Sequence, residues 1–238
     1  MSKVRLFIDH PLASGQAVAL NADQAHYISG VMRLKPGTVI EVFNGKDGGW
    51  EAEIVAASKR GGELSLLGQI RPQLDPPDLW LLFAPIKKAR TDFIVEKAAE
   101  LGASRIVPIQ TDFTNSERIR QDRLQAHAVE AAEQCGGTFV PEVAAMEQLS
   151  GLLQNWDASR RILWADESRF GPADTLSQLD RGKWALLIGP EGGFSPAERK
   201  RLSDATFVTP ISLGPRILRA DTAAVSALTL FQEHLGDW

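Results

Sequence analysis

A proline-rich segment near residue 75 limits most strongly how this chain can fold. The stretch Arg71-Pro-Gln-Leu-Asp-Pro-Pro-Asp78 holds three prolines in eight residues, so neither a helix nor a central strand continues through it. Short alternating apolar runs precede the stretch, whereas longer apolar runs and segments of helical period follow it. We therefore predict two domains, residues 1–72 and residues 76–238.

The first domain has the pattern of a small β-barrel. Alternating apolar runs predict strands at Val4–Ile8, Val39–Phe43, Glu51–Ala56 and Glu63–Gln69. The pair Asn44-Gly45 favours a tight hairpin between two of them. The segment Asn21–Gly30 starts with a capping residue and ends at a glycine, so it is the helix candidate of this domain.

The second domain has the pattern of an α/β fold with a largely parallel sheet, because apolar runs alternate with segments of helical period. The predicted strands are Leu79–Ala84, Arg105–Ile109, Arg161–Ala165, Trp184–Ile188 and Phe207–Ser212. The predicted helices are Thr91–Leu101, Ile119–Cys135, Ala145–Asn155, Pro196–Ser203 and Thr222–Leu235.

The charge balance argues against a protein that binds a polyanion over its whole surface. The net charge is −4, and residues 1–72 hold eight Lys or Arg against seven Asp or Glu, which leaves about −5 for the rest. A polyanionic partner must therefore be bound by local basic patches.

The cysteine and apolar content favour a reducing, aqueous compartment. Cys135 stands alone in the sequence, so we expect a buried thiol instead of a disulfide or a metal ligand. No apolar run approaches the roughly 18 residues that span a bilayer. We expect a cytoplasmic protein without a membrane anchor or a metal.

The segment Leu186–Glu198 is the most informative for function, since an apolar run enters a glycine-rich loop and then a helix start. Ser195, Pro196 and Glu198 predict a capping box with proline at the first helical position. The glycines just upstream allow a backbone to approach a ligand closely. The alternative is a tight turn without a ligand, and the spacing matches neither a dinucleotide fingerprint nor a P-loop.

A second loop, Ser212–Thr222, also joins a predicted strand to a predicted helix. Because ligands of open α/β sheets bind at the carboxyl ends of the strands, we expect both loops to line one pocket. Arg216 and Arg219 suit a phosphate or a base, and the alternative is a solvated pair. Asp221 by itself is more simply the N-cap of the last helix than a catalytic group.

A third segment places Lys87, Lys88 and Arg90 between the first strand and the first helix of the second domain. The helix macrodipole opposes cations at a helix N-terminus, so a structural role explains these residues poorly. Phosphates of an RNA backbone suit them better.

Together these segments make the chain resemble the bacterial 16S ribosomal RNA uridine-N3 methyltransferases of the SPOUT, or α/β-knot, superfamily. In the first domain, Arg5-Leu-Phe-Ile8 and His26-Tyr-Ile-Ser-Gly-Val-Met-Arg33 resemble the opening of a PUA-like RNA-binding domain. In the second domain, six segments resemble the family's first βα unit, its next helix and its two cofactor loops: Lys87–Arg90, Glu96–Gly102, Glu130–Gln134, Val140-Pro141, Ile188–Gly193 and Leu213–Arg219. One departure is Ala220-Asp221, where the family usually has Thr-Glu.

The resemblance implies a fold, a cofactor and partners. The fold is a SPOUT domain with a trefoil knot, whose threaded part is Trp184–Trp238, and the protein is a homodimer. The cofactor is S-adenosyl-L-methionine, and the substrate is 16S ribosomal RNA within a small-subunit particle. The apolar face of the last helix (Val225, Leu228, Phe231) fits a dimer interface, although such a stripe is more often core.

The resemblance also implies two sets of binding residues, at the positions of this sequence that match the family's motifs. The cofactor would border Ile188, Gly189, Glu191, Gly192, Gly193, Leu213, Gly214, Ile217 and Leu218. RNA would contact Arg5, His26, Arg33, Lys87, Lys88, Arg90 and Arg216.

The catalytic candidates are Arg219 and Asp221. Uridine N3 carries a proton at neutral pH, so methyl transfer needs that proton removed or the resulting anion stabilised. Arg219 could bind a uracil carbonyl oxygen, and Asp221 could accept the proton. We rank orientation of the reactants with Arg219 above Asp221, and we expect an unpaired or flipped target base.

Two rival functions stay open at this stage. A nonenzymatic RNA-binding or ribosome-assembly protein would leave the paired glycine loops unexplained. A nucleotide- or phosphate-binding α/β hydrolase would need a lysine or metal carboxylates, which the glycine-rich loop does not offer.

Overall fold

The computed structural model describes residues 4–58, 60–115, 119–169 and 176–238. The chain divides into two compact units: Met1–Asp75 with Ala132–Val140, and Pro76–Ala131 with Pro141–Trp238. The division after Asp75 falls inside the proline-rich segment. The assignment of Ala132–Val140 to the first unit has no counterpart in the sequence pattern.

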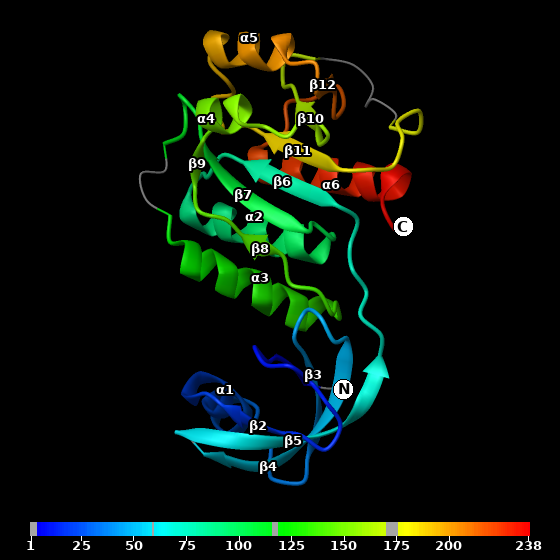
Figure 1. Cartoon of the computed structure of the whole chain (residues 1–238). Helices are drawn as coiled ribbons and strands as arrows, with labels where there is room; N and C mark the ends of the chain where they lie inside the picture. The colour runs from blue at the N-terminus through cyan, green and yellow to red at the C-terminus, as the bar shows by residue number, and fades with distance from the viewer. Residues whose placement is uncertain (1–3, 59, 116–118, 170–175) are drawn as a thin grey trace. The chain divides into compact units, whose positions relative to one another are not determined.

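The first unit contains a curled five-stranded sheet in the order β1-β3-β4-β5-β2 (Figure 1). The strands are β1 (Arg5–Phe7), β2 (Ala17–Leu20), β3 (Val39–Phe43), β4 (Gly49–Ser58) and β5 (Gly61–Arg71). Strand β1 pairs with β3 in parallel, and the other neighbours are antiparallel. Register shifts between β4 and β5 mark bulges, which increase the local bend of a sheet.

One face of this sheet holds the core of the first unit. Alternate residues such as Ile40, Val42, Ile54 and Leu64 are buried and pack together with Ile28. Ile28 belongs to a π-helical turn, η1 (Tyr27–Val31), which continues helix α1 (Ala22–His26). The predicted N-cap at Asn21 is confirmed, but the helical segment runs on past Gly30.

The β3–β4 hairpin, which Asn44-Gly45 predicted as a tight one, has a longer connection. Phe43 pairs with Gly49, so residues 44–48 form the connection. The Asn44 side-chain oxygen accepts hydrogen bonds from the amides of Lys46 and Asp47, and Gly45 and Gly48 have positive φ. An Asx-type turn therefore begins the connection.

The second unit contains a seven-stranded sheet in which every pairing is parallel, which confirms the α/β class. The strand order is β12-β10-β11-β6-β7-β8, and β9 also pairs with β7. The strands are β6 (Leu79–Phe83), β7 (Arg105–Gln110), β8 (Glu142–Val143), β9 (Glu147–Gln148), β10 (Arg161–Ala165), β11 (Trp184–Ile188) and β12 (Val208–Ile211).

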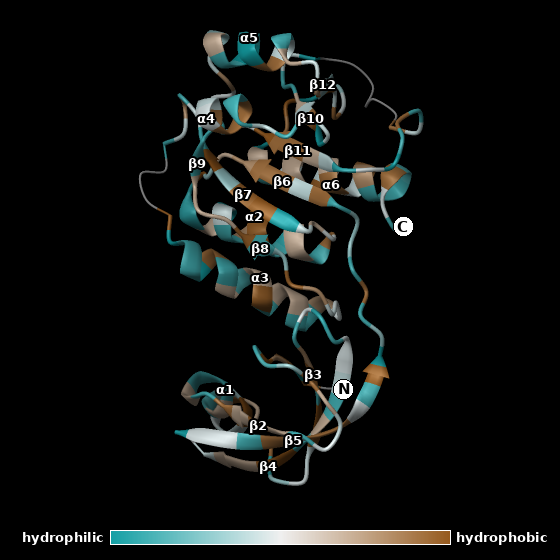
Figure 2. Ribbon diagram, in the orientation of Figure 1, coloured by the Kyte–Doolittle hydropathy of each residue, from teal (hydrophilic) through white to brown (hydrophobic). Residues whose placement is uncertain are grey.

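Helices cover both faces of this sheet. They are α2 (Lys88–Glu100), α3 (Gln121–Cys135, whose end belongs to the first unit), α4 (Leu149–Gln154), α5 (Pro196–Asp204) and α6 (Ala220–Leu235). Leu149 and Leu202 pack on one face with the strand residues Val107 and Leu187, whereas α6 contacts α2 and β11. The central strands are therefore apolar along their length, as Figure 2 shows.

Three expectations need correction. The predicted helix Ala145–Asn155 begins only at Leu149, because Glu147–Gln148 pair with Ile109–Gln110 of β7 as strand β9. The thiol of Cys135 is exposed because the residue ends α3. Leu228 and Phe231, taken as part of a possible interface stripe, are buried in the core of the chain itself.

Candidate functional site

Three loops converge at one edge of the parallel sheet. Because β10, β11 and β12 are parallel, the loops that follow them, residues 166–169, 189–195 and 212–219, leave from the same edge. Glu167 of the first loop lies against Gly193 of the second, where an added Cβ would collide with the carboxylate. The first and third loops line one pocket together.

The pocket at this edge has a volume of about 50 Å³. It is lined by Ala165, Asp166, Glu167, Arg169, Leu213, Gly214, Arg216, Ile217, Leu218 and Ala223. From the second loop, the pocket lining includes the predicted residues Leu213, Gly214, Arg216, Ile217 and Leu218, but not Arg219 or Asp221. The predicted residues of the glycine-rich loop, within 188–193, do not line the pocket. The loop 166–169 was missed, although charged residues directly after a predicted parallel strand were an available signal.

Arg199 of α5 fastens the loop after β10. Its guanidinium donates to Asp166 Oδ1 at 2.5 Å and to Glu167 Oε1 at 2.7 Å, and it stacks over the Trp164 ring at 5.0 Å. Burial disfavours the charged form of Asp166, but hydrogen bonds from the Ser168 amide and from Arg199 outweigh burial and lower its pKa. An ionised Asp166 therefore holds one wall of the pocket.

The start of α5 holds the glycine-rich loop, as the capping box predicted. Ser195 Oγ accepts from the Glu198 amide at 3.3 Å, and Glu198 Oε2 accepts from the Ser195 amide at 2.9 Å. Ser195 Oγ also donates to Asp112 Oδ2 at 2.5 Å, and this hydrogen bond links the loop after β7 to the start of α5. At Gly189 an added Cβ would lie 2.7 Å from the Phe194 ring, so this glycine is needed for packing.

The two catalytic candidates have different surroundings. Asp221 is not the N-cap of α6, because Arg219 takes that position without a side-chain hydrogen bond. Instead, Asp221 Oδ2 accepts from Arg90 at 2.8 Å, which joins the start of α6 to the start of α2. The Arg219 side chain is exposed and makes no side-chain hydrogen bond or ion pair among the described residues.

The cations expected to bind RNA also differ. Lys87 and Lys88 at the start of α2 are exposed, as is Arg216, whereas Arg90 is engaged by Asp221. Lys87 is the N-cap of α2 and forms no side-chain cap. Among the described residues these three exposed cations have no side-chain partner and are available to an anion, so they fit the expected role better than Arg90 does.

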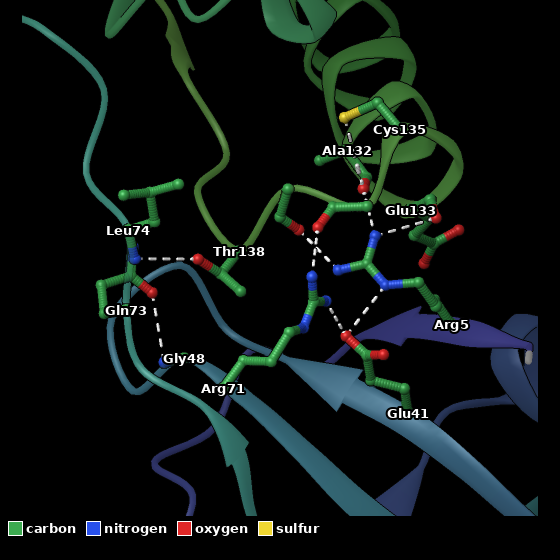
Figure 3. A network of polar contacts seen from close by, with 12 residues as sticks. Arg5, Glu41, Gly48, Arg71, Gln73, Leu74, Ala132, Glu133, Cys135 and Thr138 are labelled. Atoms are coloured by element: carbon green, nitrogen blue, oxygen red, sulfur yellow. Dashed lines mark hydrogen bonds and ion pairs between the residues drawn. The ribbon is translucent and has the colours of Figure 1, made fainter. Parts of the chain in front are cut away.

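Arg5 is part of a half-buried polar cluster in the first unit (Figure 3). Its guanidinium donates to the carbonyl oxygens of Ala132 at 2.7 Å and Gly137 at 2.6 Å, and to Glu41 at 3.0 Å. Arg71 reaches the Gly136 carbonyl and the same Glu41 carboxylate. Cations satisfy the free carbonyls at a helix C-terminus, so the Arg5 guanidinium has a structural role here. Its expected RNA contact stays a prediction.

The other two residues of that expected RNA-binding set in the first unit, His26 and Arg33, are exposed and flank η1. Within the described ranges, no cluster of His, Cys, Asp and Glu is suited to hold a metal ion. The described helices include none that is long and apolar enough to cross a membrane.

Comparison with known proteins gives matches over both units. Residues 73–232 match the model of an RNA methyltransferase domain, and residues 20–67 match the model of an RNA methyltransferase PUA domain. The chain is 29% identical to ribosomal RNA small subunit methyltransferase E of Buchnera aphidicola, over 98% of this chain and 97% of that protein. It is 30% identical to the protein of the same name from Synechocystis, over 89% of this chain and 71% of that protein.

Solved structures resemble the whole chain. A protein from Legionella pneumophila, described as a methyltransferase in complex with SAM, has a TM-score of 0.91 and 26% identity, with 100% of both chains covered. Ribosomal RNA small subunit methyltransferase E from Neisseria gonorrhoeae, bound to S-adenosyl methionine, has a TM-score of 0.88 and 25% identity, again with 100% of both chains covered.

Proposed function

The chain belongs to the RNA methyltransferase family, and from this premise we propose that it methylates N3 of a uridine in 16S ribosomal RNA of the small ribosomal subunit, with S-adenosyl-L-methionine as the methyl donor. The observation that carries the proposal is the match over both units, with relatives named for the small-subunit RNA. The loops that converge after β10, β11 and β12 support it, because open α/β sheets bind ligands at this edge.

The residues at this edge fit the cofactor. Ile217 is 71% exposed, an unusual state for a large apolar side chain unless a ligand or partner covers it. The pocket of about 50 Å³ at this edge is lined by the apolar residues Leu213, Ile217 and Leu218, which suit an uncharged purine. Gly214 of the same loop has a φ of 121°, a backbone conformation that favours glycine.

The cofactor would be held by the residues carried over from the family: Ile188, Gly189, Glu191, Gly192, Gly193, Leu213, Gly214, Ile217 and Leu218. When bound, it supplies a methyl group on a positively charged sulfur. The role of the chain is then to orient the uracil and to stabilise the anion that forms when N3 loses its proton. Arg219 fits this role, because its guanidinium is exposed and has no partner among the described residues.

Asp221 fits a positioning role better than a proton-accepting one. Its carboxylate is occupied by Arg90, and the pair links the segment that carries Lys87 and Lys88 to the start of α6. Removal of either partner would shift both segments. We therefore propose that Arg90 and Asp221 act as one unit that holds Arg219 in place, and that Lys87, Lys88 and Arg216 contact RNA phosphates.

The proposal extends to the quaternary structure and to the knot. We propose a homodimer, and light scattering that shows a monomer at micromolar concentration would contradict it. Since Leu228 and Phe231 lie in the core, this part rests on the family resemblance. We also propose the knot over Trp184–Trp238, on the family resemblance.

The main test is methylation of small subunits from a strain that lacks the protein. Purified protein with S-adenosyl-L-methionine should restore 3-methyluridine in 16S ribosomal RNA, as mapped by mass spectrometry. Arg219→Ala should lower the single-turnover rate by at least about 100-fold with cofactor binding nearly intact. Arg201→Ala, at an exposed arginine of α5, is the matched control and should leave the rate unchanged. RNA binding without any methyl transfer would favour the nonenzymatic alternative.

A second test separates positioning from proton transfer at Asp221. If the ion pair acts as a unit, Arg90→Ala and Asp221→Asn should each lower the single-turnover rate by about fivefold, and the double variant should be no worse. A general base would make Asp221→Asn far more harmful than Arg90→Ala, with a rate that rises more steeply with pH. The cycle of four proteins therefore decides the role of Asp221.

A further inference from the structure

The turn after helix α1 has an uncommon backbone. The Met32 amide donates to the Tyr27 carbonyl at 2.8 Å, five residues back, and the Leu34 amide donates to the Ile28 carbonyl at 2.9 Å. Arg33 then adopts a φ of 54°, the only positive φ of a non-glycine residue in the described ranges. Single π-helical turns and left-handed non-glycine residues are both infrequent, and both concentrate at functional sites.

The same turn exposes side chains that a folded chain usually buries. Val31 is 59% exposed and Met32 is 40% exposed, next to the exposed cations Arg33 and Lys35. Ile28, by contrast, is fully buried under the turn, so the segment is anchored to the core of the first unit. The strained backbone thus directs two apolar side chains and two cations toward solvent.

The turn is also supported from the side. The His26 ring lies against Gly30, where an added Cβ would be 2.7 Å from the ring carbon Cε1. Any larger residue at Gly30 would displace the ring or the turn. Residues 26–40 contain no Asp or Glu, so no acidic side chain of this segment opposes an approaching polyanion.

We propose that residues 31–35 form an RNA-binding wedge: Val31 and Met32 pack against the faces of unpaired bases, while Arg33 and Lys35 bind the neighbouring phosphates. The proposal rests on the proposed function, in which RNA is the substrate, and it assigns to this turn the recognition of unpaired RNA. Unpaired bases offer apolar faces beside phosphates, which matches the alternation of apolar and cationic side chains here. Two apolar side chains are too small an area for a stable protein interface.

The first experiment measures binding of the full-length protein to an oligouridylate of about 12 nucleotides and to an RNA duplex of equal length. The double variant Val31→Ser/Met32→Ser should lose at least about tenfold in affinity for the oligouridylate, with an unchanged dependence on salt. The control is Leu67→Ser, at a 43% exposed leucine of β5 in the same unit, and it should bind within about twofold of wild type. Equal binding by the double variant and the control would overturn the wedge.

Arg33→Gly gives an independent readout, because glycine adopts this φ freely. The slope of log affinity against log salt should shrink by about 0.7, the value for one lost contact to single-stranded RNA, while the unfolding midpoint stays equal to or above that of wild type. An unchanged slope would contradict phosphate binding by Arg33. Duplex RNA bound as tightly as the oligouridylate would contradict the preference for unpaired bases.

Methylation of small subunits by the wild-type protein is measured in parallel, so that the two proposals can fail separately. Wild-type methylation together with full oligouridylate binding by both variants would overturn the wedge and leave the proposed function intact. Loss of oligouridylate binding in the variants, with no methylation by wild type, would support the wedge and overturn the proposed function.

Discussion

Arg5 and Arg33 belong to the same unit and were both expected to contact RNA, yet their surroundings are opposite. The Arg5 side chain is 10% exposed and is surrounded by carbonyl oxygens and the Glu41 carboxylate. Arg33 is exposed, has a strained backbone and stands next to exposed apolar residues. The same residue type therefore serves the folded structure in one region and faces solvent in the other.

The difference lies in the hydrogen-bond acceptors that surround each guanidinium. A buried arginine must have its donors satisfied, so its surroundings are acceptors, and the guanidinium is not available to a ligand. An exposed arginine without partners retains its hydration and can exchange it for a phosphate. The acceptors around a basic residue of this chain therefore decide whether its charge is used within the fold or is available to a ligand.

The largest expected effect is at the half-buried polar cluster. Arg5→Ala should lower the free energy of unfolding by about 3 kcal/mol, because it leaves the carbonyls at the end of α3 and part of the Glu41 charge without donors. Denaturant titration measures this loss, and Arg60→Ala, at an exposed arginine of the same unit, should change stability by less than about 0.5 kcal/mol. A loss below about 1 kcal/mol for Arg5→Ala would remove the contrast between the two arginines.

An intermediate effect is expected at Asp166, whose partner Arg199 is partly exposed. Asp166→Asn should lower stability at neutral pH by about 1 kcal/mol. The pKa of Asp166 is lowered in the folded protein, so its contribution is complete above the ordinary value of 3.8 and is lost as the pH falls through the folded-state pKa. Wild type should therefore lose more stability than the variant below about pH 4. If the free energy of unfolding changes equally with pH in wild type and in Asp166→Asn between pH 7 and pH 2, the ion pair contributes nothing.

The smallest effect has the opposite sign. Arg33→Gly should raise the free energy of unfolding by about 0.5 kcal/mol, because glycine relieves the left-handed strain while its freedom in the unfolded chain cancels part of the gain. Arg33→Ala keeps the strain and is the matched control, for which no stabilisation is expected. A destabilised Arg33→Gly would mean that the side chain supports the fold, as Arg5 does.

Local signals predicted the parts of this protein that depend on neighbours in sequence. The capping box at Ser195 and Glu198, the N-cap at Asn21 and the apolar central strands were visible because their interactions span few residues. Strands β8 and β9 have two residues each, which is too short to show a period, and pairing with β7 alone makes them strands.

The amino-acid sequence by itself determined three features: the different apolar patterns on the two sides of the proline-rich segment, the α/β pattern of the second unit, and the loops that carry the proposed chemistry. Only the tertiary structure decided which charged side chains have a partner within the chain. Arg90 and Asp221 are 131 positions apart, and Arg5 is 127 positions from Ala132, so no local pattern can pair them. The physical reason is that a charge is satisfied by whatever acceptor lies within a few ångströms, and for these residues the fold alone brings those acceptors near.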